Sequence, residues 1–186
     1  EREEHHYQPG YLFLPFDKYE PDDIRKPIAE FIPKGAEFIY TKIDKIVPTE
    51  NKILLEKGDS LTYDILIIAT GTQPSPEETP GMLGPEWRNS IFDFYTFDGA
   101  LALRDKLRDW KGGKLVVHIT ELPIKCPVAP LEFICLVDEY LTQRGLRSRT
   151  KLSLMTPLTG AFTKPIASPI RNAYIDKLGT GAGWFA

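Results

Sequence analysis

The sequence predicts an α/β fold, and three patterns in the chain support this. Between residues 92 and 156 the apolar spacing alternates between helix-like and strand-like periods, which is typical of a parallel sheet with covering helices. At residues 65–69 five apolar residues follow one another without alternation, as in a strand buried on both faces. Strand-like runs at residues 37–47 and 52–56, joined by a turn, predict a small β-hairpin layer.

The composition limits the classes of protein to which this chain can belong. The chain has 186 residues, which suffice for one sizeable core or two small domains, and its net charge is −3. Basic residues are not clustered, which argues against nucleic acid as a partner. No apolar run approaches the roughly 20 residues that span a bilayer. His5 and His6 are adjacent and lack a third ligand, so we expect no metal site.

The first half of the chain is expected to consist mostly of strands and turns. Residues 1–21 are predicted to form a loop, and Pro21 is expected to begin a short helix that runs to residue 31. The hairpin follows. The apolar run then predicts a buried strand over residues 64–69, which ends at Thr70 and Gly71. Residues 72–90 are rich in Pro, Gly, Glu and Ser and are predicted to be a linker.

The second half carries the helix and strand alternation in order. We expect a helix over residues 97–110, a strand over 114–120, a helix over 131–143 and a strand over 151–155. His118 lies within the first of these strands and is expected to be a hydrogen-bonded core histidine. Beyond residue 168 the sequence predicts a short helix within 169–178 and otherwise an irregular tail.

Cys126 is the most informative single residue. It lies between a predicted strand and a predicted helix, where nucleotide-binding βα units carry glycines. Its place before a helix N-terminus favours the thiolate, which is the reactive form of cysteine, and Lys125 beside it adds positive charge. A buried, inert cysteine is the alternative. Cys135 falls on the apolar face of the helix, and we expect it to pack there. Both thiols are expected to be reduced.

Thr70 and Gly71 form the second candidate site. A buried strand that ends in Thr-Gly lets a ligand approach the backbone at the carboxyl end of a sheet. The alternative is a core strand followed by an ordinary glycine turn. The residues themselves leave both interpretations open.

Four segments resemble one family in order and spacing. Residues 123–132 (PIKCPVAPLE) resemble the redox-cysteine segment of sulfide:quinone oxidoreductases and of the related flavocytochrome c sulfide dehydrogenases. Residues 6–10 (HYQPG), 63–71 (YDILIIATG) and 156–162 (TPLTGAF) resemble further segments of that family. The resemblance extends over about residues 1–168, and the segment that contains Cys126 is its most specific part.

The resemblance implies a function and a set of roles. In that family a cysteine pair beside the flavin receives sulfide as a persulfide, and two electrons pass to FAD and then to a quinone. Cys126 matches one cysteine of the pair, and Thr70 and Gly71 match the turn that approaches FAD. The partner cysteine and the glycine-rich FAD motif have no counterpart in this chain. We therefore expect an internal fragment that is inactive by itself. Whether it retains FAD stays open.

The resemblance also implies a domain organisation. Residues 1–80 are assigned to the later part of an FAD-binding domain, and residues 81–168 to the first part of a second Rossmann-like domain that carries the redox cysteine. Residues 169–186 are expected to form an irregular C-terminal tail. The expected location is the cytoplasm or the surface of the cell membrane. Three questions stay open: whether the protein contacts a membrane peripherally, whether it forms a homo-oligomer, and whether a cytochrome replaces the quinone as electron acceptor.

Two alternatives remain. One is another FAD-dependent pyridine-nucleotide-disulfide-type oxidoreductase, similar to NADH dehydrogenases. It would need glycines after the strand that ends at Thr120, and these are absent. The other is a non-catalytic fragment without flavin, which the spectrum of the purified chain would reveal.

Overall fold

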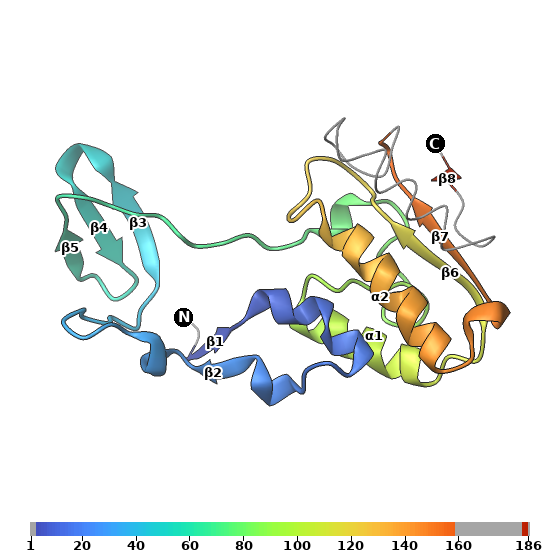
Figure 1. Ribbon diagram of the computed structural model, residues 1–186. Helices are drawn as coiled ribbons and strands as arrows, with labels where there is room; N and C mark the ends of the chain where they lie inside the picture. The colour runs from blue at the N-terminus through green and yellow to red at the C-terminus, as the bar shows by residue number, and fades with distance from the viewer. Residues whose placement is uncertain (1–2, 159–183, 186) are drawn as a thin grey trace, which may run out of the picture. The chain divides into compact units, whose positions relative to one another are not determined.

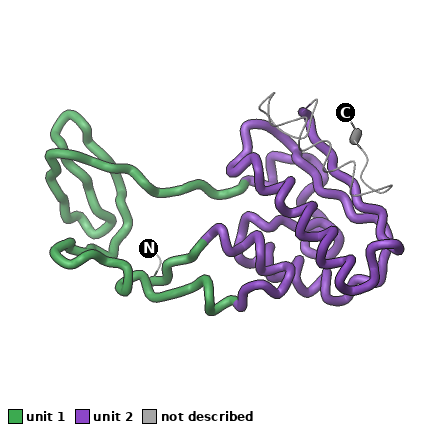
Figure 2. The backbone as a smooth tube through the Cα atoms, in the orientation of Figure 1, with its two compact units in different colours: residues 1–7, 21–74 green, residues 8–20, 75–186 purple. Residues whose placement is uncertain are grey.

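The computed structural model describes residues 3–158 and 184–185 (Figure 1). The chain forms two compact units (Figure 2). The first contains residues 1–7 and 21–74, and the second contains residues 8–20 and 75–186. Residues 8–20 therefore pack with the later part of the chain. The assignment of residues 1–80 and 81–168 to two domains of a larger flavoprotein stays a prediction.

The first unit is built from short antiparallel strands (Figure 1). Strand β1 (Glu4–His6) pairs with β2 (Arg25–Pro27). Strand β4 (Lys52–Leu55) lies between β3 (Ile43–Val47) and β5 (Ser60–Thr62). The predicted hairpin is confirmed, although its first strand begins at Ile43 rather than at residue 37. Strand β5 was not predicted, because its short polar sequence acquires strand geometry only by pairing with β4.

The predictions for residues 1–31 were partly wrong. Residues 1–21 contain β1 and two 3-10 helices, Gln8–Leu12 and Leu14–Phe16, rather than a plain loop. No α-helix forms over residues 21–31. Instead β2 is flanked by the 3-10 helices Pro21–Asp23 and Ile28–Phe31. Pro27 has no amide hydrogen for a helical bond, and the backbone beside it pairs with β1 instead.

The predicted buried strand over residues 64–69 is also wrong for this structure. These residues have no strand assignment, and no described strand pairs with them. Ile65 and Ile67 are 84% and 83% exposed. A parallel central strand needs a hydrogen-bonded neighbour on each side, so an apolar run alone does not make one.

The second unit contains the predicted alternation. Helix α1 (Phe97–Arg108) precedes β6 (Gly113–His118), and helix α2 (Ala129–Gln143) connects β6 to β7 (Thr150–Met155). The two strands are parallel, with Leu115 opposite Leu152 and Val117 opposite Leu154. The backbone of β8 (Trp184–Phe185) pairs in parallel with β7. All four predicted elements are confirmed, with ends shifted by one or two residues. The predicted helix within 169–178 lies outside the described residues.

The core of the second unit lies between α2, α1 and one face of the sheet. Ile134, Val137 and Leu141 from α2 are fully buried, as is Leu152 from β7. Phe16 from the 3-10 helix Leu14–Phe16 packs against Phe133 with ring centroids 5.2 Å apart. On β6, Val117 faces this core, so the alternating strand turns its neighbour His118 outward. The prediction of a core histidine is wrong, because His118 is exposed.

The N-terminus of α1 is held by a compact polar cluster. The Thr96 hydroxyl accepts a hydrogen bond from the Gly99 amide at 3.1 Å, which makes Thr96 the N-cap. Asp93 accepts from the Thr96 amide at 2.7 Å and pairs with Arg88 at 2.9 Å. A Cβ atom at position 99 would lie 2.3 Å from Arg88 Nη1, so a larger residue there would displace the Arg88–Asp93 pair.

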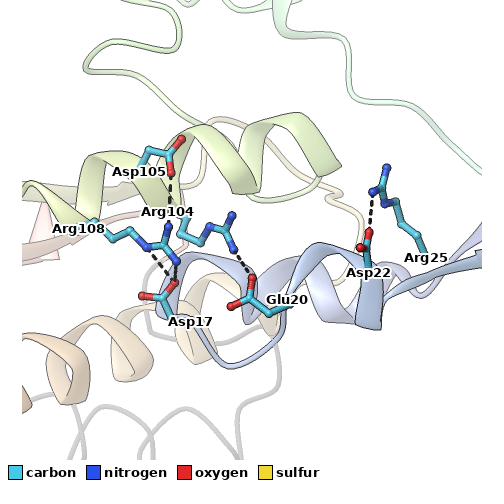
Figure 3. A network of polar contacts seen from close by, with 7 residues as sticks. All are labelled: Asp17, Glu20, Asp22, Arg25, Arg104, Asp105 and Arg108. Atoms are coloured by element: carbon cyan, nitrogen blue, oxygen red, sulfur yellow. Dashed lines mark hydrogen bonds and ion pairs between the residues drawn. The ribbon is translucent and has the colours of Figure 1, made fainter.

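Both units contain ion pairs (Figure 3). In the second unit Arg108 binds Asp17 and Arg104 binds Glu20, which ties α1 to residues 8–20. The hydrogen bond with Asp17 raises the pKa of Arg108 above its usual value. In the first unit Arg25 pairs with Asp22 at 2.9 Å. Exposed pairs of this kind contribute little to stability, so the apolar core is the main source.

No helix among the described residues is long and apolar enough to cross a membrane.

Candidate functional site

Cys126 lies in the loop that connects β6 to α2. Residues 119–128 form this loop, and α2 begins at Ala129 with Pro130 in its first turn, a position that proline favours. Cys126 is a free, exposed cysteine. The thiol is therefore open to small reagents, as a reactive cysteine must be, while its catalytic role stays a prediction.

The backbone at Cys126 has an unusual conformation. Its φ angle is +55°, in the left-handed region that non-glycine residues rarely adopt. Such a conformation persists only when surrounding contacts hold it. The Cys126 carbonyl oxygen accepts hydrogen bonds from the Ala129 amide at 3.1 Å and from the Tyr95 hydroxyl at 3.3 Å. These two hydrogen bonds can hold the backbone of Cys126 in its left-handed conformation.

Lys125 makes a second long-range contact of this loop. Its Nζ atom donates to Gln8 Oε1 at 2.6 Å, across 117 positions in the sequence. Gln8 belongs to the second unit with the loop. Lys125 thus links the loop to residues 8–20, while its effect on the neighbouring cysteine stays a prediction.

Tyr95 is anchored on both sides. Its amide donates to Asp93 Oδ1 at 3.0 Å, within the cluster that caps α1. Its ring stacks on Phe94 at 5.0 Å, and Phe94 stacks on Phe133 of α2 at 4.4 Å with an interplanar angle of 3°. Burial, together with the nearby Cys126 and Glu132, raises the pKa of Tyr95 to about 12. The phenol therefore stays protonated, and able to donate, through the neutral pH range.

Thr70 and Gly71, the predicted flavin-contact residues, lie in the first unit. Both are exposed, and Gly71 has a φ angle of +76° with no heavy atom within 4 Å of a built Cβ. The backbone at this turn is thus accessible to a ligand. Cys126 belongs to the other unit.

The remaining candidates, Cys135 and His5, lie in packing contacts. Cys135 is half-buried and packs against the core of the second unit, as its helical spacing predicts. His5 packs against Phe31 with ring centroids 4.6 Å apart. Within residues 3–158, no three His, Cys, Asp or Glu side chains lie close enough together to hold a metal ion.

The sequence did not point to Tyr95 or Gln8. Thr96 is a residue type that favours the N-cap position, so the sequence could have placed Tyr95 beside the start of α1. Its contact with Cys126 joins residues 31 positions apart. No local pattern reports a contact over that separation.

The sequence is similar to known oxidoreductases. The mitochondrial sulfide:quinone oxidoreductase of Dictyostelium discoideum is 26% identical over 165 residues, which cover 88% of this chain and 36% of that protein. The sulfide-quinone reductase of Aquifex aeolicus is 30% identical over 160 residues, which cover 84% of this chain and 36% of that protein. An alternative NAD(P)H-ubiquinone oxidoreductase of Arabidopsis thaliana is 25% identical over 60% of the chain. No protein-family model matches.

The fold agrees with the sequence comparison. The crystal structure of the sulfide:quinone oxidoreductase from Aquifex aeolicus matches 100% of this chain and 43% of its own, with a TM-score of 0.77 at 23% identity. A ferredoxin reductase from Rhodopseudomonas palustris matches with a TM-score of 0.63. The predicted Rossmann-like α/β class is therefore confirmed.

The chain spans about a third of the length of the curated relatives that it matches. Similarity in sequence covers most of the chain, and similarity in fold covers all of it. Over that third, the chain is similar to sulfide:quinone oxidoreductases in both sequence and fold.

Proposed function

We propose that this chain is part of a flavoprotein that oxidises sulfide at Cys126 and delivers the electrons through FAD to a quinone. The observation that supports this best is the exposed Cys126 at the junction of β6 and α2. The left-handed backbone there and the two hydrogen bonds to its carbonyl describe a specifically shaped loop. The names of the relatives supply the substrates, sulfide and a quinone.

The residues that would contact FAD fit an approach of the cofactor to the backbone. Gly71 has a left-handed conformation and open space where a side chain would project. Thr70 beside it is exposed as well. FAD, when bound, supplies the two-electron acceptor for the oxidation of sulfide and passes those electrons to the quinone.

The chemistry assigned to Cys126 is the formation of one bond. Its sulfur atom joins the sulfur of hydrosulfide, and the product is a persulfide on Cys126. Forming this S–S bond releases two electrons and the protons of the two sulfur groups, and bound FAD would be the acceptor for the electrons. An exposed thiol suits this role, because hydrosulfide can reach it from solvent.

Several further assignments follow from the family. The partner cysteine that regenerates the thiol is proposed to come from a part of the protein outside this chain. Residues 1–80 and 81–168 are proposed to belong to two dinucleotide-binding-like domains. A quinone is membrane-soluble, so we propose a peripheral membrane location for the complete protein.

Mixing the complete flavoprotein with sulfide or with NADH tests the function. We expect sulfide to bleach the oxidised flavin rapidly in a stopped-flow experiment and NADH to bleach it slowly or not at all. The loop between residues 119 and 128 has no glycine to admit a pyrophosphate, which is the reason for the second expectation. Rapid bleaching by NADH, with no response to sulfide, would favour the NADH dehydrogenase alternative. A complete protein purified without a flavin spectrum would favour the non-catalytic one.

A further inference from the structure

The loop of Cys126 is held by a residue that its own sequence does not reveal. The Tyr95 hydroxyl donates to the Cys126 carbonyl oxygen at 3.3 Å. The same oxygen accepts the Ala129 amide at 3.1 Å, the first amide of α2. One carbonyl thus connects the cysteine, the start of α2 and the segment that precedes α1.

The conformation of Cys126 needs such support. At a φ angle of +55° the side chain is crowded by its own backbone, and cysteine has no special preference for this region. With no opposing contact, the peptide after Cys126 would relax toward an ordinary conformation. Because the direction of the Cα–Cβ bond follows from the backbone angles, that relaxation would also redirect the thiol.

Tyr95 is placed rigidly enough to provide the support. Asp93 binds its amide at 3.0 Å, and Phe94 connects its ring to Phe133 in α2 through two stacked contacts. The hydroxyl and the helix start are therefore fixed relative to each other. The raised pKa of Tyr95, about 12, keeps its hydroxyl protonated, and so able to donate, at neutral pH.

We propose that Tyr95 is a positioning residue, whose hydroxyl holds Cys126 in its left-handed conformation and so directs the thiol toward its reaction partners. Tyr95 does not touch the sulfur in this role. The inference rests on the proposed function for the identity of the reaction, and on the hydrogen bond to the carbonyl for the positioning.

The substitution Tyr95→Phe tests the proposal in the complete protein, because it removes the hydroxyl and keeps the stacked ring. We expect sulfide to reduce the flavin of Tyr95→Phe roughly 3- to 10-fold more slowly, the scale of one lost hydrogen bond. The rate at which a quinone reoxidises the reduced flavin should stay unchanged, since Cys126 takes no part in that step. A general loss of structure would lower both rates.

Amide hydrogen exchange provides a second readout that does not depend on activity. The Ala129 amide, which binds the same carbonyl, should exchange roughly 3- to 10-fold faster in Tyr95→Phe. Pro127 and Pro130 carry no amide, so the signal of this segment is simple to assign. Tyr140→Phe is the matched control: it removes a hydroxyl that contacts Arg144 at 3.3 Å on α2, and both readouts should stay at wild-type values.

The outcomes separate the two proposals. If the wild-type flavin does not respond to sulfide, the proposed function fails, and the exchange of Ala129 alone decides on the positioning role. Unchanged exchange in Tyr95→Phe overturns that role in every case. If the wild type responds to sulfide, equal reduction rates in wild type and Tyr95→Phe overturn it as well.

Discussion

Replacing Cys126 with serine in the complete protein should lower sulfide-dependent quinone reduction by on the order of a thousand-fold, the scale of losing a nucleophile. The serine hydroxyl stays protonated at neutral pH and cannot form an S–S bond. Because Cys126 is exposed and its side chain has no role in the core, the fold and the flavin content should not change. Steady-state assays with sulfide and a short-chain quinone measure the effect.

Cys135→Ser is the matched control for this prediction. It makes the same change nine positions later on α2, at a half-buried residue that packs against the core. We expect turnover within roughly twofold of wild type, because the substitution changes one atom away from the reacting loop. Undiminished turnover in Cys126→Ser would remove this residue from the mechanism. A large loss in Cys135→Ser would transfer the role to the other thiol.

Phe133→Ala should lower the free energy of unfolding of the second unit by about 3–5 kcal/mol. Phe133 is 3% exposed and stacks on Phe94 at 4.4 Å and against Phe16 at 5.2 Å. Truncation leaves a cavity where helix α2, the residues before α1 and residues 8–20 meet. Among the described residues both α-helices belong to this unit, so the helical circular dichroism signal in a urea titration reports its unfolding.

The same substitution at Phe38 provides the comparison. Phe38 is 44% exposed and lies in the first unit. Phe38→Ala should change the helical unfolding transition by less than about 0.5 kcal/mol. A loss below about 1 kcal/mol in Phe133→Ala would contradict the view that this aromatic contact is a main element of the core.

The elements that the sequence predicted well are those whose pattern is local. In α2 the burial of Ile134, Val137 and Leu141 follows directly from their spacing at three and four residues. Strands β6 and β7 were equally visible, because each is a short apolar run between glycine or polar turns. For such segments, side-chain periodicity and helix caps are enough to predict the type and the approximate ends of the element.

The elements that the sequence predicted poorly depend on partners far along the chain. Residues 64–69 have the composition of a central strand, yet strand geometry requires neighbours that supply hydrogen bonds, and no described strand does so. Strand β2 replaces a predicted helix because β1 pairs with it. His118 was placed in the core because its strand is apolar, but the two-residue alternation turned it outward.

The features of the candidate site also divide into those that a local pattern predicts and those that depend on distant residues. Cys126 stood out from its position between a strand and a helix and from the resemblance of its flanking residues. Its left-handed backbone and its bond to Tyr95 were not predictable, since both depend on a contact across 31 positions. The sequence thus predicts which residue reacts, and the structure adds the contact that we propose orients it.

The central claim is that Cys126 receives the sulfur of sulfide. The most direct test is to treat the complete oxidised protein with sulfide in the absence of quinone, block it with an alkylating reagent and measure peptide masses. Cleavage after Glu132 separates Cys126 from Cys135. We predict that the Cys126 peptide gains one sulfur atom as an alkylated persulfide while the Cys135 peptide does not. A reduced flavin with no added sulfur on the Cys126 peptide would contradict the claim.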